Sequence, residues 1–172
     1  MLEIDKLSTS YQVKKLTPRD ADHALKLVQS NQNFFNFCPP APTRHSILED
    51  MKVVPTDKTL DDKYYLGYFD GDKLVAILDL ITGYPAPKDA WIGFFMVDSE
   101  YQKQGIGSKI IADLEAALEK SGLERIELAF PKGNEQSQKF LLKNKFQSMN
   151  REVPVPGYTM VIMEKVFHKD NK

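Results

Sequence analysis

The sequence lacks the features that mark secreted, membrane-spanning and disulfide-rich proteins. Its 172 residues contain a single cysteine, Cys38, so no disulfide forms within the chain and no oxidising compartment is indicated. It has no stretch of about 18 consecutive apolar residues, and no apolar N-terminal run precedes a small-residue cleavage site. We therefore expect a cytoplasmic protein that has no membrane partner.

Histidine is also scarce, and neither sign of charge dominates. The three histidines, His23, His45 and His168, have no cysteine or carboxylate cluster at ligand spacing, so no metal site is expected. The 23 basic and 24 acidic side chains give a formal net charge of -1. Without an excess of positive charge no long-range field attracts nucleic acid, and we expect no nucleic-acid partner.

The chain is long and apolar enough to bury one hydrophobic core. Hydrophobic residues make up 42% of it, and neither an internal repeat nor a break in composition divides it. We expect a single domain over residues 1–172, in which the polar residues 168–172 form a frayed tail.

Local patterns predict strands and helices along the chain. Apolar runs, several of them alternating with polar residues, favour strands, which we expect at 11–16, 64–69, 73–82, 90–97, 125–130, 146–153 and 158–167. Capping residues before apolar positions at helical spacing favour helices, which we expect from Pro18 to the polar 30–32 segment, at 43–53, from Gly105 to the Ser121-Gly122 cap, and at 134–144. After the aromatic residues Phe34, Phe35 and Phe37, the segment Cys38-Pro39-Pro40 is expected to exclude regular helix and to form a rigid, irregular connection.

The motif with the clearest chemical meaning is Gln102-Lys103-Gln104-Gly105-Ile106-Gly107-Ser108, between the apolar strand and an amphipathic helix. Its glycines allow close approach of a ligand to the backbone, and the first turn of the helix offers N–H groups and a favourable dipole to anionic oxygen. This pattern predicts a pyrophosphate cradle. A P-loop is excluded because GxxxxGK[ST] is absent, and the dinucleotide fingerprint fails because Ile110 stands where its third glycine belongs.

The segment from Val97 to Gly107 resembles the central acetyl-CoA motif of the GNAT superfamily, QxxGxG or RxxGxG after a strand that ends in valine. A second match is the helix that the family usually writes NxxAxxxYxKxGF, which here reads Asn134, Ser137, Phe140, Lys143 and Phe146. The resemblance covers roughly residues 60–150 well. It implies a single α/β (α+β) fold with a mixed, mainly antiparallel twisted sheet of about six to seven strands flanked by about four helices.

The resemblance also implies how acetyl-CoA, as co-substrate, is bound. Backbone amides from Gln102 to Ser108, that is Gln102, Lys103, Gln104, Gly105, Ile106, Gly107 and Ser108, would hold the pyrophosphate. The pantetheine arm would add to the strand that contains Phe95 and Val97, which normally splays from its neighbour and leaves a slot for the thioester. Asn134, Ser137 and Phe140 would lie along the pantetheine.

In this family an amine attacks the thioester directly, within a ternary complex. The backbone N–H of Phe95 would polarise the acetyl carbonyl. The usual glutamate base and tyrosine acid are replaced here by Trp91 and Leu141. Asp79 and Tyr158 are the candidate substitutes for base and acid, and a surface or packing role is the alternative for each.

The predicted function is an N-acetyltransferase that acts on an amine of a small molecule, peptide or protein. The alternatives are a catalytically silent acyl-CoA-binding or regulatory module and a binder of another nucleotide. An aromatic acceptor pocket is expected from the residues Phe34, Phe35, Phe37, Tyr65 and Tyr84. Homodimers are frequent in such families, but no sequence feature identifies an interface.

Overall fold

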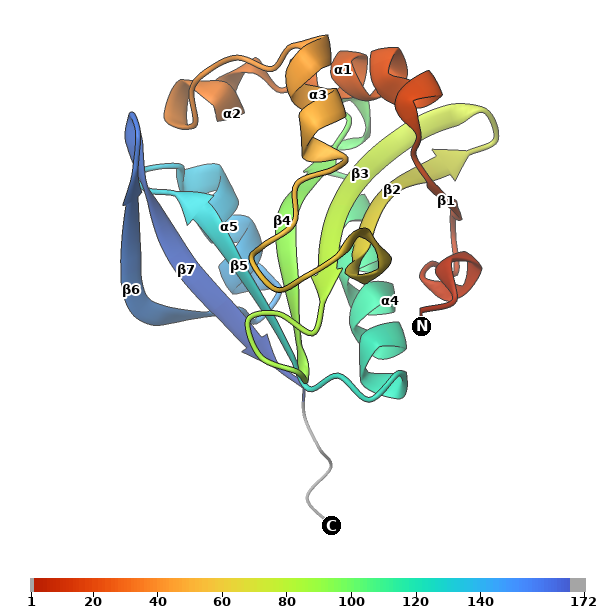
Figure 1. The fold of residues 1–172 in the computed structure, drawn as a ribbon. Coiled ribbons are helices and arrows are strands. Elements are labelled where there is room, and N and C mark those ends of the chain that lie inside the picture. Colours follow the sequence, from red (N-terminus) through yellow and green to blue (C-terminus); the bar gives the residue numbers. More distant parts are fainter. Residues whose placement is uncertain (1, 168–172) are drawn as a thin grey trace.

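A computed structural model describes residues 2–167, so the tail predicted at 168–172 lies outside the described residues. A seven-stranded sheet runs through the molecule, with helices on both of its faces (Figure 1). No helix of the described residues is long and apolar enough to cross a membrane.

The sheet has the strand order β1-β2-β3-β4-β5-β7-β6, and every neighbouring pair is antiparallel except β4 and β5. Its strands are β1 (Gln12–Lys15), β2 (Lys63–Asp70), β3 (Lys73–Thr82), β4 (Asp89–Val97), β5 (Arg125–Pro131), β6 (Gln147–Val155) and β7 (Tyr158–Val166). All seven predicted strands are present, and the apolar 90–97 run is the central one, as its two-sided burial requires.

The helices are α1 (Ala21–Gln29), α2 (Gln32–Phe37), α3 (Arg44–Asp50), α4 (Ile106–Lys120) and α5 (Glu135–Lys143). Four single-turn 3₁₀ segments, Ile4–Lys6, Pro18–Asp20, Leu60–Asp62 and Ser99–Tyr101, accompany them. The irregular connection expected at Cys38-Pro39-Pro40 is confirmed, whereas helix α2 just before it is not among the predicted elements. Proline constrains only itself and the residue before it, so the irregular backbone begins at Cys38 and the helix before it is free to form.

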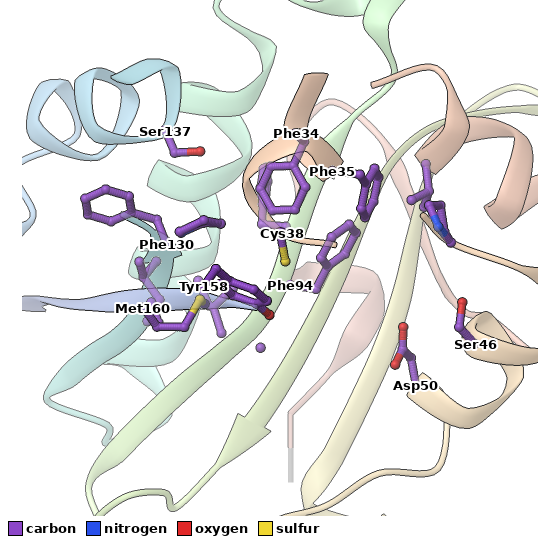
Figure 2. Close-up of a pocket in the computed structure, with 18 of the residues that line it drawn as sticks. Phe34, Phe35, Cys38, Ser46, Asp50, Phe94, Phe130, Ser137, Tyr158 and Met160 are labelled. Atoms are coloured by element: carbon purple, nitrogen blue, oxygen red, sulfur yellow. The ribbon is translucent and has the colours of Figure 1, made fainter. Parts of the chain in front are cut away.

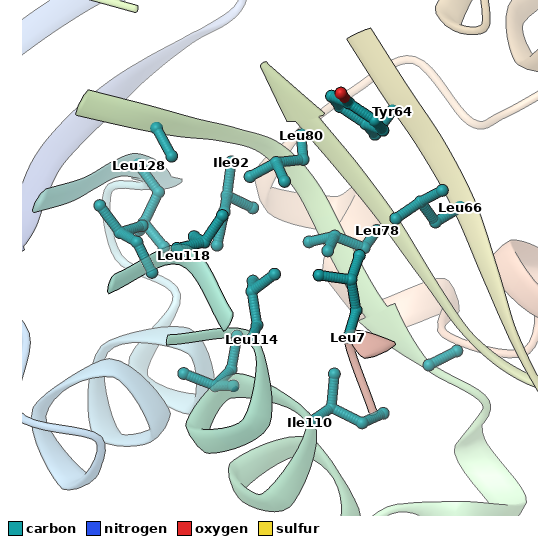
Figure 3. Packing of buried hydrophobic residues seen from close by; sticks show 14 of the residues in the cluster. Leu7, Tyr64, Leu66, Leu78, Leu80, Ile92, Ile110, Leu114, Leu118 and Leu128 are labelled. Atoms are coloured by element: carbon teal, nitrogen blue, oxygen red, sulfur yellow. The ribbon is translucent and has the colours of Figure 1, made fainter. Parts of the chain in front are cut away.

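Two hydrophobic cores lie on the two faces of the sheet. Figure 3 shows the core under α4, where Ile110, Leu114 and Leu118 pack against strand residues such as Leu78 and Leu80. The other core joins α1 and α3 to the opposite face. Because Leu114 and Leu118 are fully buried, truncating either to alanine would cost about 2–5 kcal/mol, so α4 is firmly fixed on the sheet.

The sheet opens in its centre. The parallel pairing of β4 with β5 extends only from Asp89↔Arg125 to Ile92↔Leu128, and the later residues of both strands have no partner across this boundary. On the other side of β4 the register with β3 shifts between Asp79 and Leu80. The splayed strand expected from the sequence is therefore confirmed.

Candidate active site

A groove of about 1330 Å³ follows the α4 side of this opening. We call it the α4 groove; it is bounded by the end of β4, the loop before α4, the start of α5 and the α1–α2 junction. Most of the predicted cofactor residues line it: Phe95, Val97, Gln102, Lys103, Gly105, Ile106, Gly107, Ser108, Asn134, Ser137 and Phe140. Gln104 does not, since its side-chain amide instead donates to the Glu100 carbonyl at 3.0 Å.

The two glycines of the loop meet different demands. Gly105 has φ +80°, a left-handed conformation that ordinary side chains rarely adopt, and a Cβ added there would meet no atom within 4 Å. Gly107 has ordinary φ, but an added Cβ would lie 3.0 Å from the Phe140 ring. The first glycine therefore allows the turn, and the second allows α5 to pack close to α4.

The N-terminus of α4 offers free backbone donors to the groove. The first backbone hydrogen bond of the helix runs from the Lys109 N–H to the Gly105 carbonyl at 3.0 Å, so the N–H groups of residues 106–108 have no partner within the helix. Lys103 and Lys143 add positive charge to the same wall. Unpaired amides, a helix dipole and two ammonium groups together suit a pyrophosphate.

The junction of α1 and α2 forms part of the site that sequence reasoning missed. The Asn31 side-chain amide donates to the Val97 carbonyl at 3.0 Å, and the Gln102 amide donates to the same carbonyl at 2.8 Å. Gln102 also donates to the Asn31 side-chain oxygen. The junction is thereby attached to the end of β4 and to the cradle loop. A polar stretch at 30–32 gives no sequence signal for this contact across the fold.

A second cavity, of about 360 Å³, opens on the face of the sheet covered by α1 and α3. We call it the aromatic cavity, because Phe34, Phe35 and Phe94 are among its walls (Figure 2). Tyr65 lines it as well. It shares a set of lining residues with the α4 groove, namely Phe34, Phe95, Ser137 and Phe140. The two cavities thus meet where β4 and β5 have separated.

The candidate base, Asp79, and the candidate acid, Tyr158, differ in their position relative to the aromatic cavity. Asp79 is not part of either cavity wall, but its Oδ2 would lie 3.1 Å from a Cβ at Gly93, a residue that lines the aromatic cavity. A side chain at Gly93 would therefore meet this carboxylate, which places Asp79 directly behind this part of the cavity floor. The buried Lys63 ammonium lies 3.1 Å from both Asp79 oxygens. Burial nevertheless raises the pKa of Asp79 to about 6, against the opposing effect of Lys63.

Tyr158 does line the aromatic cavity, together with Cys38. A hydrogen bond with the Cys38 thiol, aided by burial, raises the pKa of Tyr158 to about 12. The pKa of the Cys38 thiol is itself raised by burial. Both groups are therefore protonated at neutral pH, and the phenol is available as a hydrogen-bond donor rather than as a strong acid.

Trp91 and Leu141, at the positions where the family usually has its base and acid, carry no group that could take either role. Leu141 is buried and lines the aromatic cavity, while Trp91 packs edge-on against Tyr84 at a centroid distance of 6.1 Å. Of the expected acceptor aromatics, Phe34, Phe35 and Tyr65 line the aromatic cavity. Phe37 lies in the α4 groove instead, and Tyr84 lies on Trp91.

No cluster of three or more His, Cys, Asp or Glu side chains is arranged to hold a metal ion within residues 2–167. The groups that the site presents are backbone amides, the Asp79 carboxylate behind Gly93, the Asp50 carboxylate, and hydroxyl and thiol groups. Backbone amides, a buried carboxylate whose pKa is raised to about 6 and an aromatic wall are suited to transfer of an acyl group to a nucleophile.

Comparison with known proteins agrees with an acyl-transfer site. The model of the Acetyltransferase (GNAT) family matches residues 28–146. A search of curated protein sequences finds no match.

Solved structures with the same fold are numerous. An acetyltransferase from Thermus thermophilus superposes with a TM-score of 0.74 at 21% identity, over 92% of this chain and 97% of that one. The PaiA N-acetyltransferase from Thermoplasma acidophilum, in complex with coenzyme A, gives 0.67 at 17% identity over 92% and 100%. The ribosomal-protein-S18-alanine N-acetyltransferase from Escherichia coli gives 0.66 at 16% identity over 94% and 97%.

Proposed function

Because the chain belongs to the acetyltransferase (GNAT) family, we propose that it transfers the acetyl group of acetyl-CoA to an amine by direct attack in a ternary complex. The observation that carries the proposal is the meeting of the two cavities at the opening between β4 and β5. A thioester that enters from the α4 groove and an amine that enters from the aromatic cavity would meet there, which removes the entropic cost of their encounter.

Acetyl-CoA fits the α4 groove by its chemistry. The free amides of residues 106–108 would bind the pyrophosphate, and Lys103 and Lys143 would complement its charge. Phe95 has no partner on β5, so the pantetheine arm could take the place of the missing strand. In this arrangement the Phe95 N–H would stabilise the oxyanion of the tetrahedral intermediate.

Asp79 and Tyr158 have complementary roles in this proposal. Asp79, ionised above pH 6, would remove the proton of the attacking amine through a water molecule at Gly93. The Tyr158 phenol would donate a hydrogen bond to the departing sulfur. Because the pKa of Tyr158 is near 12, complete proton transfer to the thiolate is uphill, and the thiolate would take its proton from solvent.

The second candidate function is acyl-CoA binding without turnover. It is favoured by one observation, that Trp91 and Leu141 occupy the slots where the family usually has its base and acid. Tight CoA binding with no reaction would support it.

The experiment that separates these functions is an assay of free CoA released from acetyl-CoA, read with a thiol reagent, beside calorimetric titration of CoA. Since the chain has one cysteine, the protein itself contributes at most one thiol per molecule. Release beyond one equivalent in the presence of an amine is turnover and supports the transferase. Binding alone supports the silent module, and failure to bind CoA contradicts both.

A further inference from the structure

The charges around the aromatic cavity are unbalanced. Asp50, on α3, is the single aspartate or glutamate among the residues that line it, and no lysine, arginine or histidine of residues 2–167 lines it. A bound carboxylate or phosphate would find no cation there. The wall therefore disfavours acidic acceptors, including amino acids with a free carboxylate.

The buried lysine near Asp50, Lys63, is already paired with another carboxylate. Lys63 pairs with both oxygens of Asp79 and donates to the Val53 carbonyl at 2.7 Å. Asp50 is exposed to solvent and has no ion pair or side-chain hydrogen bond in the described part of the chain; partial burial raises its pKa, and the charge of Lys63 opposes that rise. Lys63 is therefore paired with Asp79, and within residues 2–167 Asp50 has no paired cation of its own.

Asp50 and the thioester end of the cavity belong to different faces of the sheet. The thioester end of the cavity is marked by Phe95, Ser137 and Phe140, and α5, which carries two of these residues, packs on the α4 side of the sheet. Asp50 belongs to α3, which packs on the other face. Figure 2 shows Asp50 and Ser46 together on α3, across the aromatic rings from Ser137. A ligand that touched both ends would cross the whole cavity.

The path between these ends is lined by aromatic rings. Phe34 stands edge-on to Phe35 and to Phe94, at centroid distances of 5.1 and 6.1 Å. Such walls favour methylene groups and the faces of aromatic rings also attract a passing ammonium. A volume near 360 Å³ suits a compact molecule rather than an extended peptide.

We infer that the acceptor is a small dication, in which the amine to be acetylated is joined by an apolar spacer to a second positive charge that binds Asp50. This inference rests on the proposed function, because it takes the end of the cavity near Phe95 as the site of reaction. Asp50 is then a specificity residue: it holds the far end of the acceptor and takes no part in the proton transfers.

The test compares α,ω-diaminoalkanes of increasing chain length with the 1-aminoalkanes of matching length, as acceptors for CoA release. The expected result is a preference of at least about tenfold in kcat/KM for a diamine of suitable length. Asp50→Asn should remove that preference by raising KM for the diamines much more than for the monoamines. Asp50→Glu, which keeps the charge, should retain it.

Glu49→Gln is the matched control, because Glu49 is the neighbouring carboxylate on α3 and does not line the cavity. It should leave the preference intact. Equal loss with monoamines and diamines in Asp50→Asn, or a preference for monoamines in the unmodified protein, would overturn the inference. A peptide preferred over every diamine would overturn it as well.

Calorimetric titration of the diamine into the CoA-bound protein keeps this inference separate from the proposed function. No CoA release with any acceptor contradicts the transferase, whereas Asp50-dependent binding of the diamine in the same samples still supports the cation site. Diamine binding that is unchanged in Asp50→Asn contradicts the cation site, whether or not the protein turns over.

Discussion

At the scale of single residues, Gly105 has two roles: it allows the left-handed turn before α4, and it lies where the anionic ligand is proposed to bind. Gly105→Glu should abolish CoA binding, because its carboxylate would lie where a phosphate is expected. Gly122→Glu is the matched control, since Gly122 also has a left-handed φ and open space around it but lies at the far end of α4. Both variants should lose about 1 kcal/mol of stability. Calorimetry checks the difference, and equal CoA affinity in the two folded variants would contradict the cradle.

Asp79 gives the site an expected pH dependence. Burial raises its pKa to about 6, so an ionised base requires pH above 6 and kcat/KM should fall below that value. Asp79→Asn should lower kcat by about 100-fold or more and remove this acid limb. The measurement is the pH profile of CoA release for both proteins.

The same pKa has a consequence for stability. Between about pH 4 and 6 the folded state binds the proton of Asp79 more tightly than the unfolded state, so this group's contribution to the unfolding free energy falls as pH rises through that window. Asp79→Asn also leaves the Lys63 ammonium buried without its carboxylate. Lys63→Met combined with Asp79→Asn should restore stability but not activity. An active double variant would show that Asp79 is structural.

At the scale of elements, α2 is the wall that the two cavities share, and its attachment to β4 is through Asn31. Asn31→Ala removes one donor to the Val97 carbonyl and should lower the unfolding free energy by about 1 kcal/mol. It should also weaken CoA binding, because the groove wall loses its attachment. Asn33→Ala, which lines the groove without contacting Val97, is the control. Thermal unfolding with and without CoA checks both effects.

Sequence predicted the elements well where local chemistry sets their ends. The limits of β3 at 73–82 follow from the Asp70-Gly71-Asp72 turn and the apolar run after it. Asn134 caps α5 as expected, and Lys145 takes the left-handed position after it with φ 70°. Helix α2 was not predicted because a helix of six residues gives too short a periodic pattern to be recognised in the sequence.

The candidate site was predictable only in part, for a physical reason. The cradle loop is contiguous, so its residues could be named in advance. The aromatic cavity instead joins α2, α3, β4 and β7, and nothing local in the sequence brings Asp50 near it. The position of Asp79 behind Gly93 depends on the register shift between β3 and β4, which alternation alone does not reveal.

At the scale of the whole molecule, the open sheet is closed at one end by an ion network around Arg125. Its guanidinium bonds to Asp89 of β4 and to Glu164 of β7, at 2.5 and 2.8 Å. It also lies 3.5 Å from the buried Glu127, which Arg151 of β6 contacts at 2.9 Å. The network therefore connects four strands at the end where β4 and β5 are still paired.

Arg125→Met should lower the unfolding free energy by about 3 kcal/mol, because it leaves the buried carboxylate of Asp89 uncompensated. Arg44→Met removes an exposed ion pair with Asp22 and should cost less than about 1 kcal/mol. Denaturant titration measures both. A similar small loss in the two variants would mean that the network is no stronger than a surface pair.

The opening between β4 and β5 also leaves backbone amides in the middle of the sheet without a partner strand. In an antiparallel pair, alternate residues point their N–H groups away from the partner, so along residues 93–97 some amides face the gap instead of β3. These amides should exchange with deuterium quickly although strands on both sides exchange slowly. Bound CoA should slow the deuterium exchange of these amides more than that of other amides in the sheet. They would then change from among the fastest-exchanging amides of the sheet to among the slowest.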